Sequence, residues 1–200
     1  DVWDLGLSVF KGTSREPLYV TKIVNNELIL RPYYPQITQV GLDVQATIEE
    51  WLWKLEMIRR NDFGDENYTA AFAGFEYSLY SIMDSAVDLG LILEYQYDQR
   101  DALNTDFGSI ELSDVVIAGF RFAMNDVQST DFLLGFGAET DNDAQFISME
   151  GSSRIGDDMK ISIEGRVFTG IDSDMSAALD TFFYSFRKDD FIQVTFEKFF

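Results

Sequence analysis

Apolar and polar residues alternate along most of this chain, in about ten segments with a period of two. In the clearest segment, Ala86 to Asp98, apolar side chains alternate with residues such as Asp88 and Glu94. Such alternation places successive side chains on opposite faces of a β-strand, and helical periodicity is weak everywhere. The sequence therefore predicts an all-β protein. The predicted strands are 2–10, 36–46, 51–57, 67–80, 86–98, 112–124, 130–140, 144–155, 159–169 and 191–200.

Strand length and connection length point to a membrane barrel. Most of the predicted strands reach about 9–11 residues, which is the length that crosses a bilayer when tilted. Short connections (47–50, 81–85, 125–129, 156–158) alternate with longer ones (11–35, 61–66, 99–111, 170–190), although 141–143 in the long set is brief. Outer-membrane barrels have short periplasmic turns and longer outer loops. The pattern predicts one domain over 1–200, an antiparallel up-and-down transmembrane β-barrel with both termini on the periplasmic side.

The two longest connections leave the strand number open between about 10 and 12. Within 11–35, the segments Leu18 to Val24 and Glu27 to Arg31 predict a small hairpin that stands above the barrel or folds into its lumen. Within 170–190, the strand-like stretch Thr181 to Phe186 predicts a second, projecting hairpin. Because Asp1 enters a strand almost at once, we also expect an N-terminal part to precede it.

The amino-acid composition excludes several kinds of catalytic and metal-binding site. The chain has no cysteine and no histidine, which removes thiolate chemistry, serine catalysis with a histidine base and most zinc sites. The carboxylate pairs Asp88 with Glu94 and Glu150 with Glu164 are nominal acid–base candidates, but their spacing does not distinguish them from wall residues. We predict no enzyme activity and no cofactor. The net charge of −20 argues against nucleic acid as a partner.

Acidic loops are the remaining candidates for metal binding. Asp141-Asn142-Asp143, Asp172-Ser173-Asp174 and Asp189-Asp190 resemble pieces of calcium sites. None forms a complete calcium loop, and Asp and Asn are also the residues that turns use. We therefore predict solvated turns and no metal site, with weak divalent bridging to lipopolysaccharide phosphates as the alternative.

The last strand carries a resemblance to Gram-negative outer-membrane β-barrel proteins. Ile192, Val194 and Phe196 share one face, and the chain stops at Phe200. This ending is similar to the C-terminal assembly signal of that class, from which Lys198 departs. The resemblance implies the outer membrane of a Gram-negative bacterium, contact with membrane lipid and lipopolysaccharide, and recognition by the barrel-assembly machinery. Aromatic residues near strand ends fit interface girdles: Trp51, Trp53, Tyr77 and Phe200 on the inner side, and Tyr95 and Tyr97 on the outer side.

Four segments resemble a porin-like proteobacterial family of obscure function. They are 12–17 (GTSREP), 51–56 (WLWKLE), 88–95 (DLGLILEY) and 119–126 (GFRFAMND). The resemblance implies location and architecture, and it is consistent with this chain being a C-terminal portion.

If the apolar face meets lipid, the opposite face lines the lumen. The predicted pore-lining residues are Lys54, Glu56, Glu76, Asp88, Glu94, Arg121, Glu139, Glu150, Arg154, Glu164 and Arg166. Strand register predicts that the last four of them, from Glu150 to Arg166, form one cluster. Charges lining a pore bias which solutes pass, so we expect a passive channel for small polar solutes with a mild preference for cations.

Two rival interpretations remain. One is a closed structural or adhesion barrel that acts through its acidic outer loops. The other is a soluble β-sandwich or lipocalin-like binder whose apolar face turns inward.

Overall fold

The computed structural model describes residues 2–24, 27–63, 66–100, 114–171 and 182–200. Their regular structure is twelve β-strands and two short 3-10 helices. The strands are β1 (Trp3–Thr13), β2 (Leu18–Val24), β3 (Glu27–Tyr33), β4 (Gln36–Ile48), β5 (Trp51–Phe63), β6 (Glu66–Leu79), β7 (Asp88–Asp98), β8 (Val115–Ala123), β9 (Asp131–Glu139), β10 (Gln145–Ile155), β11 (Met159–Thr169) and β12 (Phe191–Lys198). The helices are η1 (Ile82–Asp84) and η3 (Phe182–Phe186).

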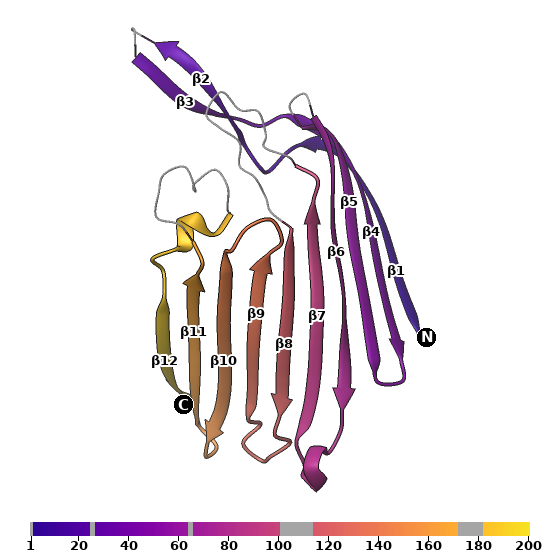
Figure 1. The fold of residues 1–200 in the computed structure, drawn as a ribbon, viewed down its shortest axis with the longest axis vertical. Coiled ribbons are helices and arrows are strands. Elements are labelled where there is room, and N and C mark those ends of the chain that lie inside the picture. The colour runs from indigo at the N-terminus through magenta and orange to yellow at the C-terminus, as the bar shows by residue number, and fades with distance from the viewer. Residues whose placement is uncertain (1, 25–26, 64–65, 101–113, 172–181) are drawn as a thin grey trace.

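Ten of the strands form one antiparallel sheet in the order β1-β4-β5-β6-β7-β8-β9-β10-β11-β12. Each strand pairs with the next one along the chain, except that the β2–β3 hairpin is inserted between β1 and β4. The predicted all-β, antiparallel, up-and-down order is therefore confirmed. Because the number of strands in this sheet is even, β1 begins and β12 ends at the same end, called the lower end below (Figure 1).

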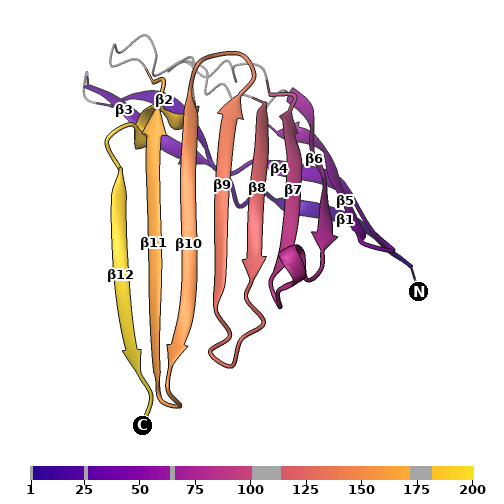
Figure 2. The same ribbon diagram turned by 60° about the horizontal axis from the view of Figure 1, so that its bottom comes forward.

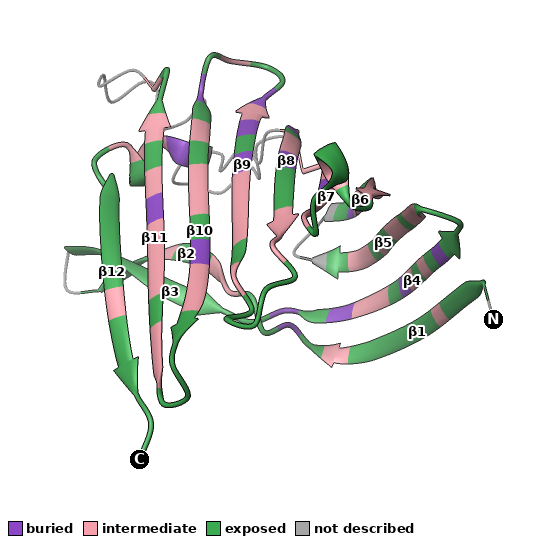
Figure 3. Ribbon diagram, turned by 90° about the horizontal axis from the view of Figure 1, so that it is seen from below, coloured by how far each residue is buried: buried purple, intermediate pink, exposed green. Residues whose placement is uncertain are grey.

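The sheet curves into an open trough. In Figure 2, β1 and β4 pass behind β7 and β8, and Figure 3 shows the trough from below, open between β1 and β12. Among the described residues no pairing joins these two edge strands. The closed barrel that the sequence predicts is thus not present in this structure.

Strand register gathers the apolar side chains on the convex face of the trough. One row of paired residues crosses nine strands without a polar side chain: Trp3, Ala46, Trp53, Phe75, Leu93, Ala118, Phe136, Ile147 and Val167. A second such row is Ile48, Trp51, Tyr77, Leu91, Phe120, Leu134, Met149, Gly165 and Ile192. A shift of one residue in any strand would turn its apolar set to the other face, and none of the nine ladders shows such a shift along these rows.

The convex apolar face is exposed. Leu93, at the middle of β7, is 43% exposed, and Phe136 on β9 is 39% exposed although each has paired strands on both sides. Apart from Ala46, the buried apolar residues lie elsewhere, in two small clusters around Tyr68 and around Phe183. The apolar side chains of the convex face therefore do not form an interior, as they would in a soluble β-sandwich or a lipocalin-like binder.

The predicted hairpin within 11–35 is confirmed, and its second strand extends to Tyr33. It forms a separate two-stranded sheet and projects beyond the upper ends of the other strands (Figure 1). Almost every residue of β2 and β3 is exposed. The Asn25-Asn26 pair between the two strands lies outside the described residues.

Three predictions about the connections are wrong. The described part of the predicted strand-like stretch 181–186 is not a strand: Phe182–Phe186 forms η3, and Phe183 packs against Phe146 and Phe168 on the concave face. The 61–66 loop is not long, since β5 and β6 continue through it to residues 63 and 66. The 81–85 turn is longer than predicted, because η1 lies within it. The alternation of short and long connections is weaker than the sequence suggests.

The turn between β8 and β9 gives a pH prediction. The backbone N–H of Thr130 donates to the Asp126 carboxylate at 2.8 Å, and this hydrogen bond is the main reason why the pKa of Asp126 lies below its ordinary value of 3.8. A depressed carboxyl pKa means that the turn gains stability above the unfolded pKa and loses it as pH falls through the folded pKa. We expect the Thr130 amide NMR shift to titrate with a midpoint below 3.8. A midpoint at or above that value would contradict this hydrogen bond.

Candidate functional site: the charged concave face

All eleven predicted pore-lining residues project from the concave side of the sheet. Successive side chains of a strand point to opposite faces, and these residues occupy the positions that alternate with the two apolar rows. The residues are Lys54, Glu56, Glu76, Asp88, Glu94, Arg121, Glu139, Glu150, Arg154, Glu164 and Arg166. That they line an aqueous path stays a prediction.

The predicted cluster on β10 and β11 is only partly present. Glu150 lies directly opposite Glu164, and Arg166 pairs with Ser148, one same-face position away. Arg154, however, is opposite Lys160, so it faces another cation. No salt bridge joins these side chains in the described part of the chain. The result is an acidic patch with cations at its two ends, where the prediction had one cluster of all four side chains.

Two of the predicted lining residues brace the lower half of the sheet. Asp88 accepts hydrogen bonds from the Ser81 backbone N–H at 2.9 Å and from the Asn125 side-chain amide at 2.8 Å. Glu76 pairs with Arg121 at 3.2 Å across the intervening β7 strand. Asp88 therefore fastens two neighbouring turns together, which is a structural role.

Glu139 does not face open space. It is buried at the upper end of β9, where Asn142 donates to one carboxylate oxygen and the Phe183 backbone N–H approaches the other at 3.3 Å. Around it, η3 covers Val115 and Phe146. This contact covers part of the upper concave face.

A second charged group on this face was not found from the sequence. The Glu16 carboxylate, in the connection after β1, accepts from Arg60 on β5 at 2.9 Å and from Arg100 after β7 at 2.8 Å. Both guanidinium groups lie over the buried ring of Tyr68, at 5.3 Å and 4.5 Å from its centroid. The sequence could have placed only Arg60 and Tyr68 on this face, from their alternating positions in β5 and β6. Glu16 and Arg100 lie in connections, where no such pattern applies.

Neighbouring side chains hold the two arginines in place. Arg100 donates to both oxygens of Asp98, with its closest contact at 2.6 Å, and Arg60 donates through Nε to Gln39 at 2.9 Å. Burial lowers the pKa of Arg100, but the hydrogen bonds to Asp98 and the attraction of nearby anions outweigh burial and leave the pKa above its ordinary value. Arg100 is therefore cationic at every accessible pH.

Beside this group the concave face is hollowed. The hollow has a volume of about 540 Å³, and Arg100 forms part of its wall together with Asp43, Glu56, Phe72 and Gln96. Asp43 and Glu56 lie directly opposite each other on β4 and β5. The wall thus offers one cation and several carboxylates to a solute.

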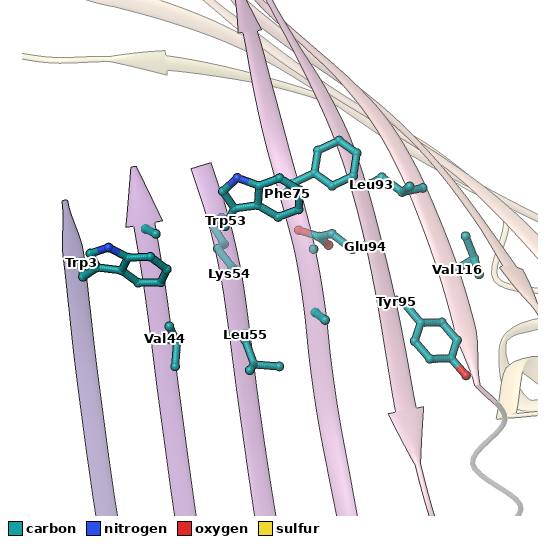
Figure 4. A pocket seen from close by; sticks show the side chains of 13 residues that line it. Trp3, Val44, Trp53, Lys54, Leu55, Phe75, Leu93, Glu94, Tyr95 and Val116 are labelled. Atoms are coloured by element: carbon teal, nitrogen blue, oxygen red, sulfur yellow. The ribbon is translucent and has the colours of Figure 1, made fainter. Parts of the chain in front are cut away.

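The convex face has a groove of a different kind. Figure 4 shows it between Trp3, Trp53, Phe75 and Tyr95, with a volume of about 610 Å³ and almost wholly apolar walls. Trp51 stacks on Trp53 and also contacts Tyr77, so three of the four aromatic residues predicted for the inner side form a packed cluster on this face, while Phe200 is fully exposed. No polar group in the groove converges on a common point, and its chemistry suits hydrocarbon.

The described acidic loops take part in turns. No group of three or more Asp and Glu side chains among the described residues is arranged to hold a metal ion. Asn142 caps Glu139 through its side chain, and Asp190 accepts from the Phe168 backbone N–H, so both serve turns. The predicted Asp172-Ser173-Asp174 piece lies outside the described residues.

Within the described ranges, no helix is long and apolar enough to span a membrane. No family model matches the chain, and no curated protein or solved structure matches it either.

Proposed function

We propose that the protein is an outer-membrane β-barrel of a Gram-negative bacterium, with its convex face against lipid and its concave face towards water. The observation that carries the proposal is the pair of uninterrupted apolar rows on an exposed face. A soluble monomer rarely exposes a contiguous apolar patch of more than a few hundred Å², whereas these rows cross nearly the whole sheet. The acyl chains of a lipid bilayer would cover such a face, as they cover the exterior of a transmembrane barrel.

The proposal requires the two free edges to be paired in the membrane, because unpaired backbone groups are not tolerated in hydrocarbon. β1 and β12 run in opposite directions, and each turns its apolar residues to the convex side. Side chains at these edges, such as Leu7 and Val194, are more exposed than those of the inner strands. An antiparallel closure that involves both edges would continue the apolar rows in phase.

Within the barrel we propose a passive channel for small polar solutes. The concave wall carries both signs of charge, and the facing Glu150 and Glu164 give it an acidic patch. Single-channel recording in planar bilayers tests this: we expect conducting insertions with a mild cation preference. Changing Glu164→Gln should move the reversal potential towards zero, because one carboxylate leaves the patch. Insertions that never conduct would remove the channel.

A closed structural or adhesion barrel is the second candidate, and the filling of the upper concave face favours it. The Phe183 cluster and the Glu16 contacts both occupy that end of the trough. Liposome swelling with small sugars separates the two candidates: swelling supports the channel, and its absence with a correctly inserted protein supports the closed barrel.

The proposed partners follow from the location. They are membrane lipid and lipopolysaccharide, the barrel-assembly machinery through the strand that ends at Phe200, and small polar solutes. Membrane fractionation with a heat-modifiable gel shift tests the location: the folded protein should stay in the detergent-dependent fraction and change mobility on heating. Recovery from the aqueous fraction would contradict it.

A further inference from the structure

Arg59 lies on the convex face, at the upper edge of its apolar surface, and is held by neutral partners. It alternates with Arg60 on β5 and so shares the side of the strand that carries Met57. Its Nη1 donates to the Thr69 hydroxyl at 2.9 Å and to the Gln99 side-chain oxygen at 3.1 Å. No salt bridge between described residues includes Arg59. A guanidinium group has five N–H donors, so this one is fixed in place with donors left for an anion.

A second cation lies on the same edge of the convex face. Lys11 is exposed on β1, two strands away from β5, and it follows Val9 on the convex side. It too takes part in no salt bridge with a described residue. The Asp114 carboxylate, at the start of β8, accepts from the Tyr95 hydroxyl. The upper edge of the convex face above β1 and β5 therefore carries positive charge, although the net charge of the chain is −20.

The convex groove lies below these cations. It has a volume of about 610 Å³, and Leu55 and Tyr95 stand on either side of Ala73 along its wall (Figure 4). On the convex side of β6, only the small side chain of Ala71 separates Ala73 from Thr69, the cross-strand partner of Arg59. The apolar groove and the cation are thus in line along one strand.

The distance between groove and cation suits a lipid. From Trp53 in the groove to Arg59, β5 rises about 20 Å. For a strand tilted by about 40° this is about 15 Å along the membrane normal. One leaflet of the hydrocarbon core has the same depth, half of about 30 Å. A lipid with its head group at Arg59 therefore places its acyl chain beside Trp53.

We propose that the groove and the two cations form a binding site for a lipid with a phosphorylated head group. One acyl chain lies in the groove, Arg59 donates to the phosphate, and Lys11 adds a second positive charge beside it. The inference rests on the proposed function, which places the convex face in a bilayer. Charge complementarity favours this occupant over a second copy of the chain, because a symmetric contact through the same surface would bring like cations together.

Tryptophan quenching in phosphatidylcholine vesicles tests the site, because Trp3 and Trp53 line the groove. A small fraction of the lipid is replaced by phosphatidic acid or by phosphatidylcholine, each brominated at the middle of its acyl chains. We expect the relative affinity from quenching to favour phosphatidic acid by about tenfold or more, because each cation near an anionic head group contributes roughly fivefold.

Charge variants assign the preference to this edge of the convex face. Arg59→Gln combined with Lys11→Gln should remove it, and Arg59→Lys should keep most of it. Lys198→Gln is the matched control. It removes one positive charge from the same face near the lower end, where Lys198 alternates with Glu197 on β12, and it should leave the preference unchanged.

Equal affinity of the wild type for the two brominated lipids would overturn the site, as would a preference that survives loss of both cations. Quenching by both lipids that weakens as the protein is concentrated in the bilayer would indicate a second copy over the groove, and would also overturn it. If neither brominated lipid quenches at all, the convex face does not lie in lipid, and the proposed function fails together with the site.

Discussion

Replacing Leu93 with lysine should lower the free energy of unfolding in lipid vesicles by about 2–4 kcal/mol, the cost of a lysine on the lipid face at the bilayer midplane. Leu93 lies at the middle of β7, paired with Phe75 and Ala118 in the first apolar row. Its side chain points to the convex side, so a charge there would meet hydrocarbon. Denaturant unfolding in vesicles, followed by tryptophan fluorescence, measures the change.

Gln96→Lys is the matched control, because it adds the same side chain to the same strand on the concave face. Gln96 is exposed there, with acidic Glu56 and Asp98 in the same hollow. We expect a change within about 0.5 kcal/mol. If the two variants lose equal stability, or if Leu93→Lys is neutral while Gln96→Lys is destabilising, the assignment of the faces is wrong.

Gly170→Ala should be strongly destabilising, by about 3 kcal/mol. Gly170 follows β11 with a φ of +70°, where an L-residue costs about 1–2 kcal/mol, and the backbone oxygen of Asp143 occupies the space that a Cβ would need. Relieving that overlap requires the backbone to move, which adds about 1–3 kcal/mol. The same vesicle unfolding measurement gives the value.

Gly156→Ala separates the two contributions. Gly156 has a similar φ of +65°, but nothing lies within 4 Å of its ideal Cβ position. The Gly156→Ala variant should therefore lose about 1–2 kcal/mol of unfolding free energy, from backbone conformation alone. Equal losses in the two variants would mean that the contact between the Gly170 turn and Asp143 is absent in the membrane.

The faces of the strands could be predicted from the sequence because a period of two leaves only two possible sides. The alternate positions of Leu93 and Glu94 on β7, for example, already separate the convex face from the concave face. The same holds for the β2–β3 hairpin, whose two short strands flank an Asn-Asn pair. Local pattern and local structure agree in these places.

Contacts made by the connections could not be predicted. Glu16 and Arg100 are 84 residues apart, and nothing in their local sequence indicates that they meet. The stretch 182–186 has strand-like composition, yet Phe183 gains more from packing on Phe146 and Phe168 as part of η3 than a free hairpin would offer. Alternation also says nothing about closure, which depends on what pairs with β1 and β12.

The convex face can be tested most directly with the protein's own fluorescence. Trp3, Trp51 and Trp53 are the three tryptophans of the chain, and all lie on the convex side. In vesicles, lipids brominated on their acyl chains should quench most of the tryptophan emission, while aqueous iodide should quench little. Strong quenching by iodide together with no effect of brominated lipid would contradict a lipid-facing convex surface.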